Sequence, residues 1–314
     1  MHTNHLKPGI KTGPNLDDTQ RLTESGARYT EVWYRVDQPE KYVNLFNHIK
    51  EHGIYTGLHF WGMLEHNIMP NLAYPDPKIA AATLDLIKQN IDVAAKHGFY
   101  YVNVHVGNAI LQKIDFDNNT MTGLPDTLVE MSRAEDAAQR HIHELTGYAK
   151  SSGVQLIVET VPVMEPQSLE DHIAGKPTTP ANTLSNTFLE RMGREYHIEV
   201  NNDISHTVTE MLSNDRTELW DYLLARTKAL APFTKLVHIN TMIEPFNGTD
   251  THDGITAKDF THDVFPTKSQ LIELLRVLNE TANTHNRDIW FVCEPRNEHV
   301  QNYDALCELL ASIA

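Results

Sequence analysis

A unit made of a short apolar segment, a loop and an amphipathic helical segment repeats along almost the entire chain. The apolar segments contain runs such as LIV, WFV and KLV, which are typical of parallel strands buried on both faces. The expected strands cover 7–13, 30–37, 54–61, 99–107, 154–161, 197–202, 235–240 and 288–294. The expected helices cover 17–25, 39–53, 78–98, 132–153, 188–196, 217–231, 269–285 and 302–313. This alternation predicts an α/β fold, a closed (β/α)8 TIM barrel, and no G-x-G-x-x-G follows the first strands to favour a dinucleotide-binding sheet.

The length of 314 residues suits one such barrel, and neither a linker nor a change of composition divides it. We therefore expect 1–314 to be a single domain, with insertions in the loops that follow the strands. Cys293 and Cys307 are too few for a disulfide framework, which suits a reducing compartment. The N-terminal residues form no apolar leader and no run is long enough to span a membrane, so a cytoplasmic protein is expected.

The formal net charge is -16, and Lys and Arg form no cluster anywhere in the sequence. Phosphate backbones are bound by local concentrations of Lys and Arg, so this pattern argues against nucleic acid as a partner. A small molecule is the expected partner. The apolar stretch FWGML (60–64) is a candidate for a pocket wall or for a subunit contact in a homo-oligomer.

Residue types that bind metals recur where the expected strands end. They comprise four carboxylates and five histidines: His59, His105, Glu159, Asp203, His206, His238, Asp250, His252 and Glu294. Because the carboxyl ends of all strands in a parallel barrel meet at one rim, we expect these side chains to converge. The sequence therefore predicts one polar site at that rim.

Each residue alone has an ordinary structural explanation. Asp203 could cap the following helix, and His59 or His105 could be a core histidine bonded to a carbonyl. Taken together, however, the four carboxylates need positively charged partners. At the ends of the expected strands, Arg296 is the one Lys or Arg that we identify as a candidate partner. Carboxylates mixed with imidazoles, without thiolates, favour Zn²⁺, with Mn²⁺ and Fe²⁺ as alternatives, and the nine residues could hold one to three ions.

The segments HFWG, NVHVGN, IVET, NNDISHT, LVHIN, DTHDG and FVCEP, in this order and spacing, resemble the endonuclease IV/xylose isomerase-like TIM-barrel superfamily. The resemblance covers about 54–296. The endonuclease pattern implies three ligand groups: Glu159, Asp203, His238 and Glu294; His59 and His105 with Glu159 bridging; and His206, Asp250 and His252.

Sugar isomerases and epimerases of the same superfamily are similar only at the first of these groups. That second resemblance implies one divalent ion, with Glu159 and Glu294 moving a proton on either face of a sugar carbon. It also implies that His206 lies near the substrate.

The sequence favours a small substrate over DNA. In the loops after the third, fourth, fifth and seventh strands, Asp and Glu outnumber Lys, so this rim would repel a duplex. The tyrosine that helps endonuclease IV to open DNA also has no counterpart after His59. Trp61 is a candidate platform for a sugar face, and Arg296 is a candidate to grip a phosphate or carboxylate.

Two kinds of enzyme are favoured by the sequence, and a DNA-acting AP endonuclease is a third alternative that the acidic loops disfavour. The leading hypothesis is a multinuclear metal-dependent hydrolase that attacks a sugar-like or phosphorylated compound with a metal-activated hydroxide, or an iron-dependent oxidative enzyme with the same cluster. The close alternative is a sugar or sugar-phosphate isomerase or epimerase with one ion, in which Glu159, Glu294 and His206 are catalytic. A metal-binding protein without enzymatic activity is the remaining class.

Overall fold

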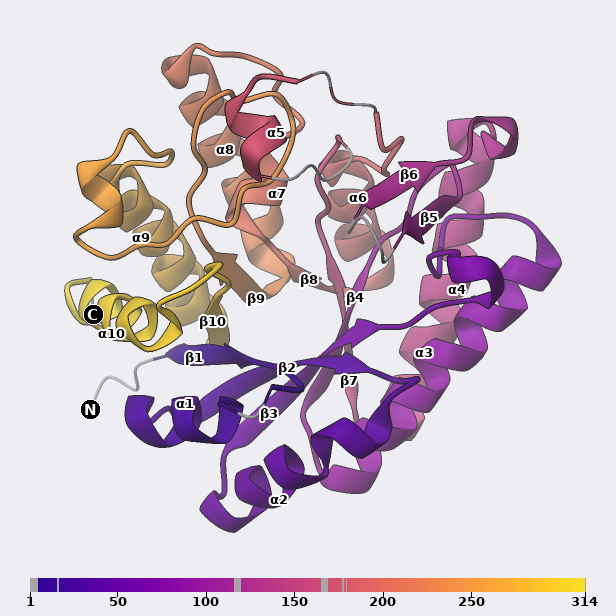
Figure 1. Cartoon of the computed structure of the whole chain (residues 1–314), viewed down its shortest axis with the longest axis horizontal. Coiled ribbons are helices and arrows are strands. Elements are labelled where there is room, and N and C mark those ends of the chain that lie inside the picture. The colour runs from indigo at the N-terminus through magenta and orange to yellow at the C-terminus, as the bar shows by residue number, and fades with distance from the viewer. Residues whose placement is uncertain are drawn as a thin grey trace.

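The computed structural model describes residues 5–15, 17–115, 120–164, 169–176, 178 and 180–313. In this part of the chain, eight parallel strands close into a barrel in the order β1-β10-β9-β8-β7-β4-β3-β2, and helices surround it (Figure 1). The barrel strands are β1 (Leu6–Thr12), β2 (Tyr29–Arg35), β3 (Tyr55–Trp61), β4 (Tyr101–His105), β7 (Gln155–Glu159), β8 (Glu199–Asn201), β9 (Thr234–Ile239) and β10 (Ile289–Cys293). The predicted (β/α)8 barrel is confirmed, and each predicted strand overlaps one of the eight.

The helices between the strands also follow the predicted order. They are α1 (Asp18–Ser25), α2 (Val43–His52), α3 (Pro77–His97), α4 (Met131–Ser151), α6 (Asn186–Tyr196), α8 (Arg216–Leu230), α9 (Lys268–His285) and α10 (His299–Ala311). Helix α3 illustrates why the boundaries were predictable: the Asp76 side chain accepts hydrogen bonds from two backbone N–H groups of the first turn, and Pro77 opens the helix. None of the described helices is both long and apolar enough to cross a bilayer.

Short elements within the insertions were not predicted. The strands β5 (Gln112–Asp115) and β6 (Thr120–Gly123) form an antiparallel hairpin after β4. Helix α5 (Leu169–Ile173) lies in the insertion after β7, and α7 (Ile204–Val208) follows β8 directly. All of these elements follow strands, so they build on the face where barrels place their active sites.

An apolar layer fills the barrel interior towards the N-terminal ends of the strands. Its members are Tyr101, Ile157, Leu236, Trp290 and Val292. The rings of Tyr101 and Trp290 lie 4.6 Å apart between centroids. Tyr101 can point inward because its partner on the neighbouring strand is Gly57, which has no side chain. This layer closes the barrel below the polar residues described next.

Gly57→Ala is expected to lower the free energy of unfolding by about 2 kcal/mol or more. A Cβ at position 57 would lie 2.0 Å from Cζ of Tyr101, whose ring is held in the core. Urea denaturation measures the effect. Gly147→Ala is the matched control, because a Cβ on this exposed position of α4 meets nothing within 4 Å and Ala stabilises a helix. Equal stability of the two variants would contradict the packing described here.

Candidate metal centre

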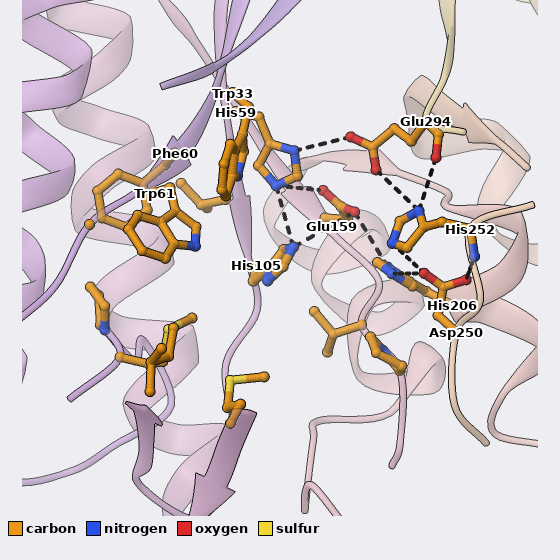
Figure 2. A pocket seen from close by; sticks show the side chains of 18 of the residues that line it. Trp33, His59, Phe60, Trp61, His105, Glu159, His206, Asp250, His252 and Glu294 are labelled. Carbon is orange, nitrogen blue, oxygen red and sulfur yellow. Dashed lines mark hydrogen bonds and ion pairs between the residues drawn. The ribbon is translucent and has the colours of Figure 1, made fainter. Parts of the chain in front are cut away.

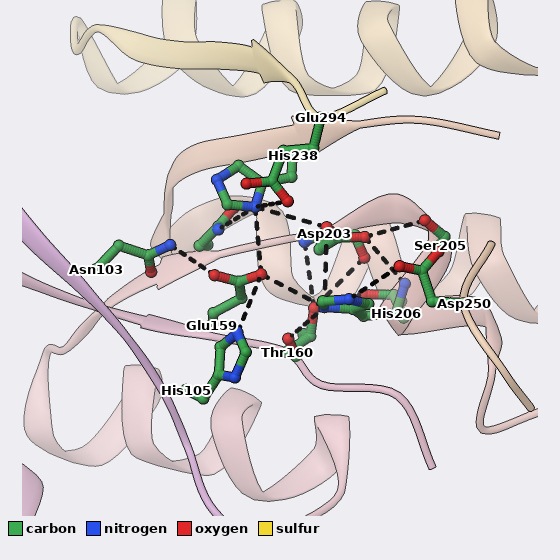
Figure 3. Close-up of polar contacts among 12 residues, drawn as sticks. Asn103, His105, Glu159, Thr160, Asp203, Ser205, His206, His238, Asp250 and Glu294 are labelled. Carbon is green, nitrogen blue, oxygen red and sulfur yellow. Dashed lines mark hydrogen bonds and ion pairs between the residues drawn. The ribbon is translucent and has the colours of Figure 1, made fainter. Parts of the chain in front are cut away.

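A polar layer lies above the apolar one, at inward-facing positions near the C-terminal ends of the strands (Figure 3). The strand register brings these positions level with one another. Lys11 on β1 pairs with Glu31 on β2, and His105 on β4 pairs with Glu159 on β7. Glu159 in turn pairs with Asn201 on β8. Side chains that are distant in sequence therefore enter the barrel at the same height.

All nine predicted ligand residues converge in or just above this layer. They form three groups whose donor atoms lie within 4.8 Å of one another: Glu159, Asp203, His238 and Glu294; His59, His105 and Glu159; and His206, Asp250 and His252. These groups agree with the division that the family resemblance implied. Whether each group binds an ion stays a prediction.

The central group is arranged around His238. Its Nδ1 atom lies 3.2 Å from Oε1 of Glu159, 3.5 Å from Oδ2 of Asp203 and 3.4 Å from Oε2 of Glu294. The side chains of His238 and Glu159 are fully buried, and that of Glu294 is 11% exposed. Three carboxylates thus face one imidazole nitrogen in a space from which water is largely excluded.

The other two groups lie on either side of Glu159, with His59 and His105 on one side and His206, Asp250 and His252 on the other (Figure 2). Nε2 of His59 lies 3.4 Å from Oε2 of Glu159 and 3.3 Å from Nε2 of His105. His105 is the most open of these, with a side chain that is 45% exposed. In the third group Oδ2 of Asp250 lies 3.4 Å from Nε2 of His206 and also contacts Nε2 of His252.

Asp203 combines its two predicted roles in one carboxylate. Oδ1 accepts a hydrogen bond from the backbone N–H of His206 at 3.0 Å, so it caps α7. Oδ2 is buried, and among the described residues it has no hydrogen-bond partner. A buried carboxylate oxygen without a donor is costly, and a cation in the central group would satisfy it.

Two histidines are oriented by groups behind them. Nδ1 of His206 donates to the Thr160 carbonyl at 2.9 Å, which leaves Nε2 facing the site. Nε2 of His238 lies 2.7 Å from Oε2 of Glu31, which leaves Nδ1 facing Glu159. A carboxylate or carbonyl behind the imidazole is the usual means by which proteins orient a metal-binding histidine.

The expectation that no cation other than Arg296 stands near the carboxylates was wrong. The Lys11 ammonium is almost fully buried at the end of β1, where Nζ donates to Oε2 of Glu31 at 2.6 Å and contacts Oε1 of Glu294. Nζ also lies 2.7 Å from Nδ1 of His59. Lys11 therefore supplies one of the positive charges that were assigned to metal ions alone.

Lys11 and Glu31 were both missed in the sequence. A signal was present, because YTEVWYRV places a Glu inside a strand that is rich in apolar and aromatic residues. A charged residue at such a position needs a partner of opposite sign. The partner could not be named without the register that pairs β1 with β2.

The electrostatics of the layer keep its carboxylates ionised. Burial raises the pKa of Glu159, but the imidazoles of His238 and His59 outweigh it and hold the pKa well below its usual range. Burial likewise opposes ionisation of Glu31, yet Lys11 and His238 lower its pKa to about 2. The layer is therefore a set of ionised carboxylates whose charge is balanced by Lys11 and the imidazoles, and their oxygens are suited to bind cations.

A divalent cation fits the donor set of the central group. The unpartnered Oδ2 of Asp203 and the site-facing Nδ1 of His238 are the atoms that such an ion would bind, together with oxygens of Glu159 and Glu294. Three carboxylates and an imidazole suit Mn²⁺, Zn²⁺ or Fe²⁺.

Comparison with known proteins places the chain in a family. The family model described as "Xylose isomerase-like TIM barrel" matches residues 20–299. The chain belongs to this family. No curated protein matches the sequence.

Solved structures of the same fold include two named as epimerases or epimerase-like. A D-tagatose 3-epimerase-like protein is 14% identical, with a TM-score of 0.63 and coverage of 97% of each chain. An L-ribulose 3-epimerase is 16% identical, with a TM-score of 0.60 and coverage of 98% of this chain and 95% of that chain. A xylose isomerase-like TIM barrel protein from Mycobacterium smegmatis in complex with magnesium is 12% identical, with a TM-score of 0.59 and coverage of 100% of both chains. At these identities the likeness shows the fold alone.

The two predicted substrate-binding residues of this xylose isomerase-like barrel both line a cavity above the polar layer. The ring of Trp61 is also in contact with the protein itself: the Arg35 guanidinium lies 4.4 Å from its centroid, and the Trp33 ring lies 5.3 Å away. Arg296 Nε donates to the Thr251 carbonyl at 2.5 Å. Substrate contact by either residue stays a prediction.

Proposed function

We propose that this chain is a divalent-metal-dependent sugar isomerase or epimerase. The observation that carries the proposal is the placement of Glu159 and Glu294. They approach the same nitrogen of His238 from β7 and from the end of β10, two strands that do not touch in the barrel order. With two carboxylates on either side of one binding space, one carboxylate can remove a proton from one face of a carbon. A proton can then be returned to the opposite face of that carbon or to a neighbouring atom.

The surrounding residues suit the proposed roles of Glu159 and Glu294 in proton transfer. A divalent ion held by the central group would polarise a sugar carbonyl and so acidify the adjacent C–H bond. Glu159 is positioned by Asn103, whose Nδ2 donates to Oε2 at 2.5 Å. Glu294 is positioned by Lys11. The site-facing Nε2 of His206 is suited to hold a substrate oxygen. Each carboxylate can then accept or return one proton, and no redox partner is needed.

Family membership and neighbours named as epimerases support this proposal over the hydrolase that the sequence alone favoured. The substrates named for those neighbours are small sugars, which fits a cavity lined by the polar layer on one side. We therefore place a carbohydrate in this site and keep Mn²⁺ or Zn²⁺ as the expected ion.

Removal of metal should abolish the reaction. The purified protein, dialysed against EDTA, is expected to lose at least about a hundredfold of its activity on a panel of D-tagatose, D-fructose and L-ribulose. Addition of Mn²⁺ or Co²⁺ should restore it. Interconversion of these sugars is followed by chromatography. Conversion that is unaffected by EDTA would refute a metal-dependent mechanism.

A second candidate is a hydrolase with a multinuclear cluster, and the specific observation in its favour is the convergence of His206, Asp250 and His252. His252→Ala distinguishes the two candidates. For the isomerase or epimerase, the variant should keep one ion per chain and most of its activity. For the hydrolase, the wild type should bind about three ions and the variant should lose both an ion and its activity. Elemental analysis of the two proteins, combined with assays, decides between them.

A further inference from the structure

The cavity above the polar layer is larger than a simple sugar requires. Its volume is about 1010 Å³. A hexose has about twelve non-hydrogen atoms, and even at roughly 30 Å³ each, the volume of a water molecule in the liquid, it would occupy about 360 Å³. More than half of the cavity would remain for another part of the ligand.

The two sides of this cavity differ in chemistry. The ligand groups lie on one side, whereas Trp33, Phe60 and Trp61 lie together on the other side of His59 (Figure 2). Further apolar side chains come from the segment before α3 and from the β5–β6 hairpin: Met69, Ile114 and Met121. We refer to these six residues as the apolar wall. A sugar can stack one face on a ring such as Trp61, and an aromatic substituent would match the remaining apolar surface.

The aromatic part of the apolar wall is fixed in place by the barrel. Trp33 on β2 is level with His59 on β3, and Arg35 is level with Trp61, so Trp33 and Trp61 continue the same inward-facing rows as the polar site. Phe60, which alternates with them on β3, packs against the core on the other face of the strand. Arg35 lies over Trp61 and also forms two hydrogen bonds to the Asp37 carboxylate, at 3.2 and 2.7 Å. Trp33 is nevertheless 38% exposed, so it presents a ring surface to the cavity.

The cations that line the cavity do not form a phosphate site. Among the described residues they are Lys11, Arg21 and Arg296. Lys11 is bound by Glu31 and Glu294, and Arg21 by the Asp18 carboxylate at 2.9 Å. Arg296 donates through Nε to the Thr251 carbonyl and interacts with the Asp253 carboxylate. The apolar wall itself contains no charged group. A neutral ligand is favoured over a phosphorylated one.

We propose that the natural substrate is a sugar that has a carbonyl group and carries an apolar, aromatic substituent, such as an aryl glycoside with a keto group on the sugar ring. The sugar would lie against the polar layer, and the substituent would pack on the apolar wall. Aromatic rings favour this environment because they bury a large apolar surface and stack on tryptophan. The inference rests on the proposed function for the placement of the sugar.

The test compares the binding of phenyl and methyl glycosides to the Mn²⁺-loaded protein by isothermal titration calorimetry. The panel pairs the phenyl and methyl β-glycosides of glucose, galactose, mannose and xylose. In at least one pair, the phenyl compound is expected to bind about tenfold more tightly or better. Trp33→Ala should reduce this preference to about twofold without changing the metal content.

Tyr100→Ala is the matched control, because this exposed aromatic residue lies just before β4, at the other end of the barrel. It should leave the preference unchanged. Equal affinities in every pair, a preference that survives Trp33→Ala, or tighter binding of glucose 6-phosphate than of all phenyl glycosides would each overturn the proposal. If ketoses are interconverted while the phenyl preference is absent, this inference fails and the isomerase proposal stands. If the preference is present without any isomerase or epimerase activity, the isomerase proposal fails and this inference stands.

Discussion

Glu159→Gln should abolish turnover of a ketose by this protein, with kcat reduced by about a thousandfold. The substitution keeps the size of the side chain but removes the charge that faces His238 and His59. A neutral amide cannot accept the substrate proton, and it also weakens a ligand of the central ion. Product formation by the metal-loaded variant measures the loss.

Glu199→Gln is the matched control for this experiment. Glu199 begins β8, at the opposite end of the barrel from the polar layer, and its nearest cation is Arg287, at 4.0 Å. Its replacement should leave kcat within about twofold of the wild type. If the Glu159→Gln protein retained both its ion and full activity, Glu159 would have no role in the reaction.

Lys11→Met should lower the free energy of unfolding of the metal-free protein by about 3 kcal/mol or more. The substitution leaves Glu31 fully buried without the ammonium that donates to it at 2.6 Å. Glu31→Gln in the same chain should recover part of the loss, because it removes the charge left unpaired. Urea denaturation in the presence of EDTA measures all three proteins.

Lys7→Met provides the control on the same strand. Lys7 lies 3.6 Å from the Asp288 carboxylate, and the two side chains are 23% and 46% exposed. Ion pairs that water reaches contribute little, so the change should be within about 1 kcal/mol. Equal effects of Lys7→Met and Lys11→Met would show that the buried pair with Glu31 does not stabilise the fold.

The sequence predicted the barrel and the convergence of the nine ligand residues for one physical reason. The strands of a parallel barrel all end at the same rim, so polar residues that follow apolar strands must meet there. His105 and Glu159 illustrate this, since each is the last residue of its strand and the two are paired in the sheet. Knowledge of the order of the strands was enough for this prediction.

Pairings that depend on register could not be obtained in the same way. Lys11 is the penultimate residue of β1 and Glu31 lies inside β2, where a shift of one residue would turn either side chain out of the barrel. The short helix α7 was also missed, although its cap Asp203 was considered, because five residues show too little periodicity.

The choice of reaction was the weakest part of the sequence-based interpretation. The same carboxylates and imidazoles serve hydrolysis and proton transfer, so the ligand residues by themselves did not separate the two. The multinuclear hydrolase was favoured because residues such as His252 lacked another role. We propose the alternative because of the placement of Glu159 and Glu294.

Exchange of substrate hydrogen with solvent tests the central claim most directly. The Mn²⁺-loaded protein is incubated in D2O with D-tagatose, D-fructose, L-ribulose and sugars that carry a phenyl group, and the products are examined by mass spectrometry. The account predicts that deuterium enters a carbon next to the carbonyl of at least one sugar, and that EDTA or Glu159→Gln prevents it. Hydrolysis of a phosphoester or glycoside by the same protein, with no deuterium in any sugar, would contradict the account.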